Sequence, residues 1–147
     1  QVEAECRRQG IPLERIRFVT AHREEIPAFI RLAAASVIFI RPDLAKAGCS
    51  PTNLAELYAC NVPVVANSGV GDMDDIIDTA RNGSVLLKDW SRSAMEEAVG
   101  RLLTNLEDGL PDILGNSQEF SLEEGVSRYA RVYEELLTEK EGESKNA

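Results

Sequence analysis

The sequence predicts an α/β protein with a Rossmann-like parallel sheet flanked by helices. Short apolar runs alternate with amphipathic helical patterns, which is typical of linked strand–helix–strand units. Residues 36–41 (SVIFIR) form a continuous apolar run rich in branched side chains, as expected for a parallel strand covered on both faces. From Ser50 to Asp72, a Ser-Pro helix start, an apolar helix, a buried strand and a glycine turn follow one another.

Each element follows from its local pattern. Strands are expected at residues 15–20, 36–41, 62–66 and 83–87, all parallel in one sheet with right-handed crossovers. Besides the helix that starts at Pro51, helices are expected at residues 1–9, 26–35, 72–81, 91–103, 111–114 and 122–137. The helix at 91–103 should bury Met95, Ala98, Val99, Leu102 and Leu103. Residues 1–138 then form one domain, and the charged tail at 139–147 is expected to be disordered.

Composition limits the partners. With 25 acidic and 16 basic residues among 147, the net charge of −9 disfavours a nucleic-acid or anionic-membrane surface. Cys6, Cys49 and Cys60 are odd in number and lack C-x-x-C spacing, which indicates reduced thiols in a cytoplasmic protein. His22 is the single histidine, so a histidine-rich metal site is excluded. No apolar run approaches the roughly twenty residues that span a bilayer.

The start of the helix near residue 50 is suited to bind a phosphate. Ser50 can cap the helix, and Pro51 suits the first helical position because its missing N–H costs nothing there. The N–H groups of Thr52, Asn53 and Leu54 then remain unpaired at the positive end of the helix dipole. A plain capping role is the alternative for the Ser-Pro pair alone.

Glu56 is a lone carboxylate on this otherwise apolar helix. It lies four residues after Thr52, so both side chains share one helical face. A carboxylate among apolar neighbours is costly unless it has partners, such as two adjacent ribose hydroxyls. The order of helix start, carboxylate, strand and glycine turn therefore favours a nucleotide-sugar site.

The run SPTNLAE, followed by Ala59 to Val65, resembles the donor-binding region of retaining GT-B glycosyltransferases of the family 4 (group 1) type. Within that group it is most similar to members with an SPTK-x-x-E-x-x-A-x-G-x-P-V-V run. The resemblance implies diphosphate contacts at the helix start, ribose binding by Glu56, a UDP- or GDP-linked sugar donor, and no cofactor or catalytic metal. The nucleotide-sugar-binding residues are then Ser50, Pro51, Thr52, Asn53, Glu56, Gly69, Gly71, His22 and Arg23.

Three positions depart from the family pattern. Asn53 replaces the lysine, which removes a positive charge, and Lys46 in the preceding loop is a candidate replacement. Asn61 replaces a glycine, although asparagine tolerates the left-handed conformation. Gly48 stands where the more widespread form of the family has the first of two glutamates. These departures support an alternative, a non-catalytic nucleotide-binding or assembly module with a degenerate donor domain.

Two loops supply the remaining candidate residues. His22 and Arg23 follow the strand at 15–20, where the resemblance places the donor cleft, and an exposed loop is the alternative. This run (VTAHREE) also resembles part of UDP-N-acetylglucosamine 2-epimerases, but nothing downstream matches their S-G-G-x-x-E-E segment. Gly69 and Gly71 would bring backbone close to the sugar, and Asp72 is expected to cap the next helix.

The resemblance covers the rear part of a donor domain, over about residues 1–137. It implies that the chain is a fragment of a hexosyltransferase-like enzyme of bacterial polysaccharide or glycoconjugate biosynthesis. The fragment is expected to be inactive alone, and any peripheral membrane association would be made by the missing parts of the protein. No catalytic residue and no acceptor can be assigned. Self-association is expected for two reasons: one strand edge would be unpaired, and the helix at 122–137, which is expected to pack against the missing acceptor domain, would leave apolar surface. The apolar residues of that helix are Val126, Tyr129, Val132, Tyr133 and Leu136.

Overall fold

A computed structural model describes residues 2–144, with side chains described to residue 138. Three parallel strands form its sheet, in the order β1 (Ser36–Ile38), β2 (Val64–Asn67) and β3 (Val85–Leu87). The other elements are α1 (Val2–Arg8), η1 (Leu13–Arg15), η2 (Arg23–Glu25), α2 (Ile26–Ile30), α3 (Thr52–Ala59), α4 (Met73–Ile76), α5 (Thr79–Asn82), α6 (Arg92–Asp108), η3 (Gly115–Phe120) and α7 (Leu122–Ser144).

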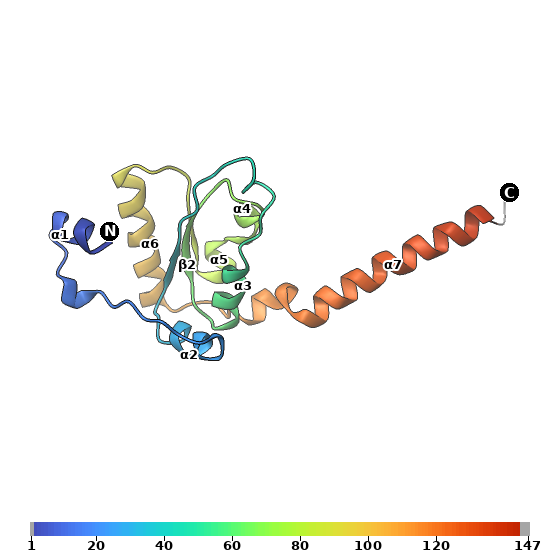
Figure 1. Cartoon of the computed structure of the whole chain (residues 1–147), viewed down its shortest axis with the longest axis horizontal. Coiled ribbons are helices and arrows are strands. Elements are labelled where there is room, and N and C mark those ends of the chain that lie inside the picture. The colour runs from blue at the N-terminus through green and yellow to red at the C-terminus, as the bar shows by residue number, and fades with distance from the viewer. Residues whose placement is uncertain (1, 145–147) are drawn as a thin grey trace.

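Helices cover both faces of the sheet (Figure 1). On one face, α3 and α4 pack Leu54, Tyr58 and Met73 against Val64 and Ala66 of β2. On the other face, α6 packs Ala98 and Leu102 against a second cluster, whose strand members are Val65, Val85 and Leu87. All four residues of β2 are buried, as expected for the central strand. The predicted α/β class with a Rossmann-like parallel sheet is confirmed.

The strand predicted at residues 15–20 is wrong. Residues 16–20 belong to no strand or helix, and the backbone N–H groups of 17–21 donate to no described protein acceptor. Phe18 is 65% exposed and Val19 is 58% exposed. An extended segment is stabilised as a strand only through a neighbouring strand, and none of the three described strands pairs with it.

Three of the predicted helices differ from those in the structure. The helix expected at 72–81 is split into α4 and α5, because the Asp78 carboxylate accepts from the N–H groups of Ala80 and Arg81 and starts a new helix. Residues 113–114 form a turn before η3, so the helix predicted at 111–114 is wrong. The helix predicted at 26–35 ends early, at Ile30.

Helix α6 is longer than predicted and buries a narrower stripe. It continues to Asp108, while Ala98 and Leu102 are buried and Met95 is partly buried, as expected. Val99 and Leu103 are about half exposed, which contradicts the prediction. A single helix packed on a sheet buries only the side that meets the strands. Val99 and Leu103 directly follow the buried Ala98 and Leu102 and so lie on another side of the helix, where they remain exposed to water.

A hydrogen-bonded group lies at the centre of the core. The Tyr58 hydroxyl donates to Ser84 Oγ at 3.0 Å, and the Val64 N–H donates to the same oxygen at 3.0 Å. The Ser84 hydroxyl in turn donates to the Asn82 carbonyl at 3.3 Å. Burial raises the pKa of Tyr58 to about 12. The phenol therefore stays protonated and keeps its donor role at physiological pH.

Asn61 adopts the left-handed conformation that the sequence led us to expect, with φ of 61°. Its side chain adds a contact that a glycine could not make, because Oδ1 accepts from the N–H groups of Ile113 (3.1 Å) and Leu114 (3.4 Å). Asn61 thus links the turn between α3 and β2 to the segment that follows α6.

We expect Asn61→Ala to lower the free energy of unfolding by about 2 kcal/mol and Asn61→Gly by about 1 kcal/mol. Both variants lose the side-chain hydrogen bonds, but only alanine also strains a left-handed backbone. Urea unfolding followed by circular dichroism measures both values. Equal losses in the two variants would show that the backbone conformation contributes nothing.

Helix α7 extends away from the rest of the molecule (Figure 1). It continues helical to Ser144, so residues 139–144 have helical backbone, while residues 145–147 and the side chains beyond 138 lie outside the described residues. The predicted disorder of the tail therefore stays a prediction. Among the described residues, no helix has the length and apolar character needed to cross a membrane.

Candidate functional site

Two of the predicted site residues line one cavity between α2 and α3. Arg23 and Glu56 reach it from η2 and the middle of α3, and its volume is about 350 Å³. The remaining lining residues are Ile26, Pro27, Ile30, Arg31, Ala59 and Cys60. Pro27 lies in the first turn of α2, where a missing N–H is tolerated and the chain can turn toward α3.

The cavity combines two cations, one anion and an apolar wall. Arg23, Arg31 and Glu56 are all exposed, so the burial cost expected for the Glu56 carboxylate is wrong. Among the described residues, Arg23, Arg31 and Glu56 form no ion pair with one another or with any other side chain. Their polar groups are therefore available to a ligand. A guanidinium binds phosphate oxygens through paired N–H groups, and a carboxylate accepts from two neighbouring hydroxyls. The aliphatic side chains of α2 supply a surface for a flat, weakly polar ring.

Arg31 is the member of this cavity that the sequence pattern does not single out. The apolar stripe of residues 26–35 marks the core-facing positions and leaves Arg31 on the helix surface. The sequence did contain one indication that Arg31 is unusual, because it is the basic residue of an otherwise uncharged stretch from Ile26 to Ile40. Cys60 also lines the cavity, and its thiol lies 3.9 Å from the Pro27 carbonyl oxygen.

The start of α3 differs from the expectation in detail. Pro51, with extended ψ of 109°, occupies the cap position, and no side chain, Ser50 included, caps the helix. The Leu54 N–H donates to the Pro51 carbonyl at 3.0 Å, so it is not free. Among the described residues, the N–H groups of Thr52 and Asn53 have no protein acceptor. The predicted set of three free N–H groups is reduced to two.

The helix start and Glu56 do not share a cavity. Ser50, Pro51 and Thr52 line a separate hollow of about 180 Å³ with Ile76 and Phe120. Asn53 is exposed. The structure therefore brings Arg23 and Glu56 together, but it leaves the expected phosphate-binding N–H groups outside their cavity.

Gly69 and Gly71 hold the turn after β2 against the loop that precedes α3. The Gly71 N–H donates to the Lys46 carbonyl at 3.0 Å, and the Gly69 N–H donates to Asp74 Oδ2 at 2.9 Å. Asp72 occupies the cap position of α4, but its side chain makes no capping bond, so its expected capping role is wrong. These contacts explain the glycines by packing, and the role predicted for them in sugar binding stays a prediction.

His22 lies outside the cavity. It is exposed, and its backbone N–H donates to Glu25 Oε2 at 2.8 Å, which caps η2. Lys46 is also exposed. Within the described residues, no group of three or more His, Cys, Asp and Glu side chains is arranged to hold a metal ion.

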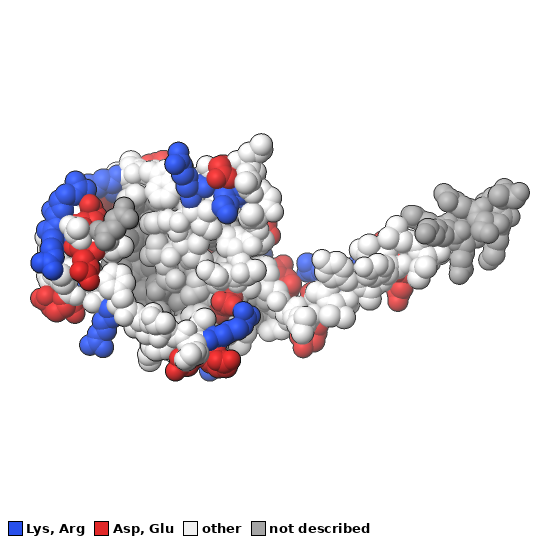
Figure 2. Space-filling view, in the orientation of Figure 1, with Lys and Arg blue, Asp and Glu red and all other residues white. Residues whose placement is uncertain are grey.

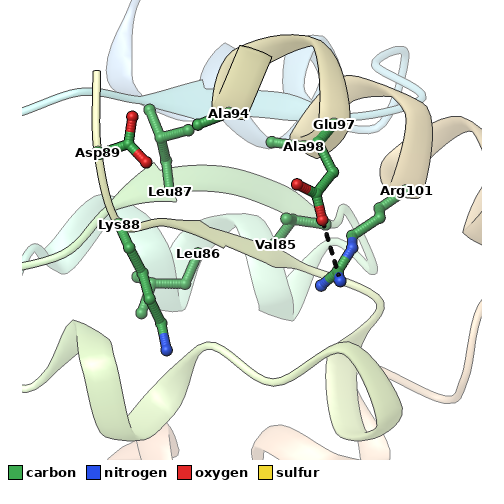
Figure 3. Close-up of a pocket in the computed structure, with 9 residues that line it drawn as sticks. All are labelled: Val85, Leu86, Leu87, Lys88, Asp89, Ala94, Glu97, Ala98 and Arg101. Carbon is green, nitrogen blue, oxygen red and sulfur yellow. Dashed lines mark ion pairs between the residues drawn. The ribbon is translucent and has the colours of Figure 1, made fainter. Parts of the chain in front are cut away.

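A second hollow, of about 290 Å³, lies between β3 and α6 and contains none of the predicted residues (Figure 3). Arg101 and Glu97 form an ion pair of 3.1 Å at its rim, which leaves no free charge of α6 directed at a ligand. On the face seen in Figure 2, charged side chains gather around the margin and uncharged ones cover the middle. Lys88 and Asp89 also line this second hollow. The cavity between α2 and α3 is taken as the candidate site because it contains two of the predicted residues, Arg23 and Glu56.

Comparison with known proteins identifies the family and the fold of the chain. Residues 1–105 match the family model described as glycosyl transferases, group 1. The chain is similar in structure to sucrose-phosphate synthase from Thermosynechococcus elongatus, with a TM-score of 0.63 and 20% sequence identity. The match covers 93% of this chain and 34% of that one, and at this identity it shows the fold alone. No curated protein sequence matches the chain.

Proposed function

The chain belongs to the group 1 glycosyl transferases, and we propose that it supplies part of the donor site for transfer of a sugar from a nucleoside-diphosphate sugar to an acceptor. The observation that carries this proposal is the cavity that Arg23, Arg31 and Glu56 share. Its carboxylate suits the two ribose hydroxyls, and its guanidinium groups suit the diphosphate.

In this proposal the chain stabilises the leaving group. Charge develops on the departing diphosphate during sugar transfer, and the guanidinium groups of Arg23 and Arg31 would neutralise it if the diphosphate enters their cavity. The free N–H groups of Thr52 and Asn53 would add to this effect if the donor extends from the cavity to the start of α3. No residue is assigned as a nucleophile. The retaining route, a UDP- or GDP-linked donor and a cytoplasmic location complete the proposal.

Binding of UDP and GDP to the chain tests the donor site. We expect weak binding, with a Kd on the order of 1 mM, because the match covers only 34% of the structurally similar synthase and the proposed cavity would hold only part of a donor. Chemical-shift changes in nuclear magnetic resonance spectra detect affinities in this range. The largest changes should occur around Arg23, Arg31 and Glu56.

Glu56→Gln is expected to weaken this binding by about tenfold or more, since it removes charge-assisted hydrogen bonds to the ribose. Glu107→Gln, at an exposed position of α6, is the matched control and should leave the affinity unchanged. Equal affinities for the wild type and the Glu56→Gln variant would contradict the ribose-binding role. Shift changes confined to the hollow between β3 and α6 would contradict the site.

A non-catalytic nucleotide-binding module is the second candidate. Asn53 and Gly48 support it, because both stand at positions where the resembled enzymes carry a charged residue. Both candidates predict nucleotide binding at the same cavity. A full-length protein that binds nucleotide but releases no nucleoside diphosphate from a panel of sugar donors would favour the module.

A further inference from the structure

Asn82 is the one asparagine in the sequence that precedes a glycine. In such a pair the backbone nitrogen of the glycine can attack Cγ of the asparagine side chain, because glycine has no Cβ to hinder the approach. The new N–C bond closes a succinimide ring, and the side-chain nitrogen leaves as ammonia with the proton of the attacking N–H. Water then opens the ring to aspartate or to isoaspartate, in which the main chain runs through the former side chain.

The attacking nitrogen is not free in the folded chain. Asn82 is the last residue of α5, and the Gly83 N–H donates to the Thr79 carbonyl at 3.0 Å. Gly83 is buried, and its own carbonyl accepts from the Asn105 side chain of α6 at 2.9 Å. Breaking a buried backbone hydrogen bond is costly, so the nitrogen keeps its proton and does not attack.

The Asn82 side chain is fixed as well. It is 4% exposed, and its amide donates to the Ile76 carbonyl at 2.8 Å. Its Oδ1 accepts from the backbone N–H groups of Asp78 and Ser84, both at 3.2 Å. These bonds would have to break before Cγ could turn toward the nitrogen of Gly83. Succinimide formation therefore requires α5 to open first.

The products of the reaction do not fit the folded site. A carboxylate at position 82 has no N–H to donate to the Ile76 carbonyl, and it would place a buried negative charge against that oxygen. Isoaspartate would also lengthen the main chain just before Ser84, whose hydroxyl oxygen accepts from Tyr58 and Val64 in the core. A chain that has reacted while α5 is open therefore cannot restore the original contacts.

We propose that the Asn82–Gly83 bond is a modification site that is closed while α5 is folded and reacts only when α5 opens. Because neither product fits the folded site, the reaction makes the opening of α5 permanent. The site is independent of the cavity between α2 and α3, since none of the residues that line that cavity belongs to α5 or to its hydrogen bonds.

Mass spectrometry of the whole chain, incubated folded and in guanidinium chloride, tests the proposal. Trypsin cleaves after Arg81 and Lys88, so the peptide 82–88 separates this asparagine from the others. We expect the modified fraction of the peptide to rise at least about tenfold more slowly in the folded chain than in the unfolded chain. Equal rates in the two samples, or no reaction in the unfolded chain, would overturn the proposal.

Asp78→Ala distinguishes opening of α5 from unfolding of the whole chain. The change removes the carboxylate that accepts from the N–H groups of Ala80 and Arg81, and it should speed the reaction in the folded chain by about tenfold. Ser91→Ala removes the equivalent cap of α6 and should leave the rate within about twofold of the wild type. If Asp78→Ala reacts no faster than Ser91→Ala, α5 does not control Asn82 and the proposal is overturned.

Asn82→Asp carries the side chain of one product and tests whether α5 can close again. We expect the equilibrium constant for unfolding to rise about tenfold or more, because the buried carboxylate has no donor for the Ile76 carbonyl. Urea unfolding followed by circular dichroism measures this change. A variant as stable as the wild type would show that α5 closes over the product, which would overturn the permanence of the opening.

Discussion

Gly71→Ala should lower the free energy of unfolding by about 3 kcal/mol or more, which is among the largest effects a single methyl group can produce. A Cβ at this position would lie 1.9 Å from the Cys49 carbonyl oxygen and 2.6 Å from its carbon. Both are backbone atoms, so no side-chain rotation relieves the clash. The φ of 51° adds strain for any residue with a side chain. The loop before α3 would have to move.

Urea unfolding of the variant measures this loss, and Gly100→Ala is the matched control. Gly100 lies within α6, and a methyl group added there would meet no atom within 4 Å outside its own helix backbone and chain neighbours. Alanine at this position should therefore stabilise the chain by about 0.5–1 kcal/mol. A Gly71→Ala variant as stable as the wild type would show that the contact between the two loops is easily released.

Ser84→Ala is expected to lower the free energy of unfolding by about 2–4 kcal/mol. The Ser84 oxygen accepts from Tyr58 and Val64, and its hydrogen goes to the Asn82 carbonyl, so its capacity for hydrogen bonds is fully used. Alanine would leave two buried donors without an acceptor, each at a cost of about 1–3 kcal/mol.

The double variant separates this pair from simple loss of packing. Tyr58→Phe alone should cost about 1 kcal/mol, and Tyr58→Phe combined with Ser84→Ala should cost less than the sum of the two, since one unpaired donor is then absent. Additive losses in urea unfolding would show that water replaces the missing oxygen.

The parts of the fold that could be predicted from sequence are those with a strong local pattern. The apolar runs around β2 and β3 identify strands that are buried on both faces, and the apolar pattern of α7 identifies a helix of several turns. The run around β1 also identifies a strand, but the expected cover on both faces is wrong, because Val37 is 61% exposed. Residues 15–20 have a similar pattern but form no strand, because strand formation depends on a neighbour that local sequence does not reveal. The break between α4 and α5 depends on one carboxylate, Asp78.

The candidate site could also be predicted only in part, because local sequence does not reveal which elements pack together. Glu56 stands out as a charge on an apolar helix, and Arg23 follows from its position in the loop before α2. Which side chains share a cavity is decided by how α2 packs on α3, and Arg31 enters the site only through that packing. The separate hollow at Ser50 likewise reflects the placement of Phe120, which lies far along the chain.

The buried side chain of Asn67 has a consequence for the chemical ageing of the protein. Its amide donates to the Ile40 carbonyl and accepts from the Ile40 N–H, both at 2.8 Å. The side chain thus makes the pair of hydrogen bonds that a backbone peptide group of a neighbouring strand would make, and it links the ends of β1 and β2. Deamidation to aspartate would place a negative charge against the carbonyl oxygens of Ile40 and Ser68. A single hydrolysed amide would thus separate two strand ends, and the lifetime of the folded chain in storage depends on how well this side chain stays shielded from water.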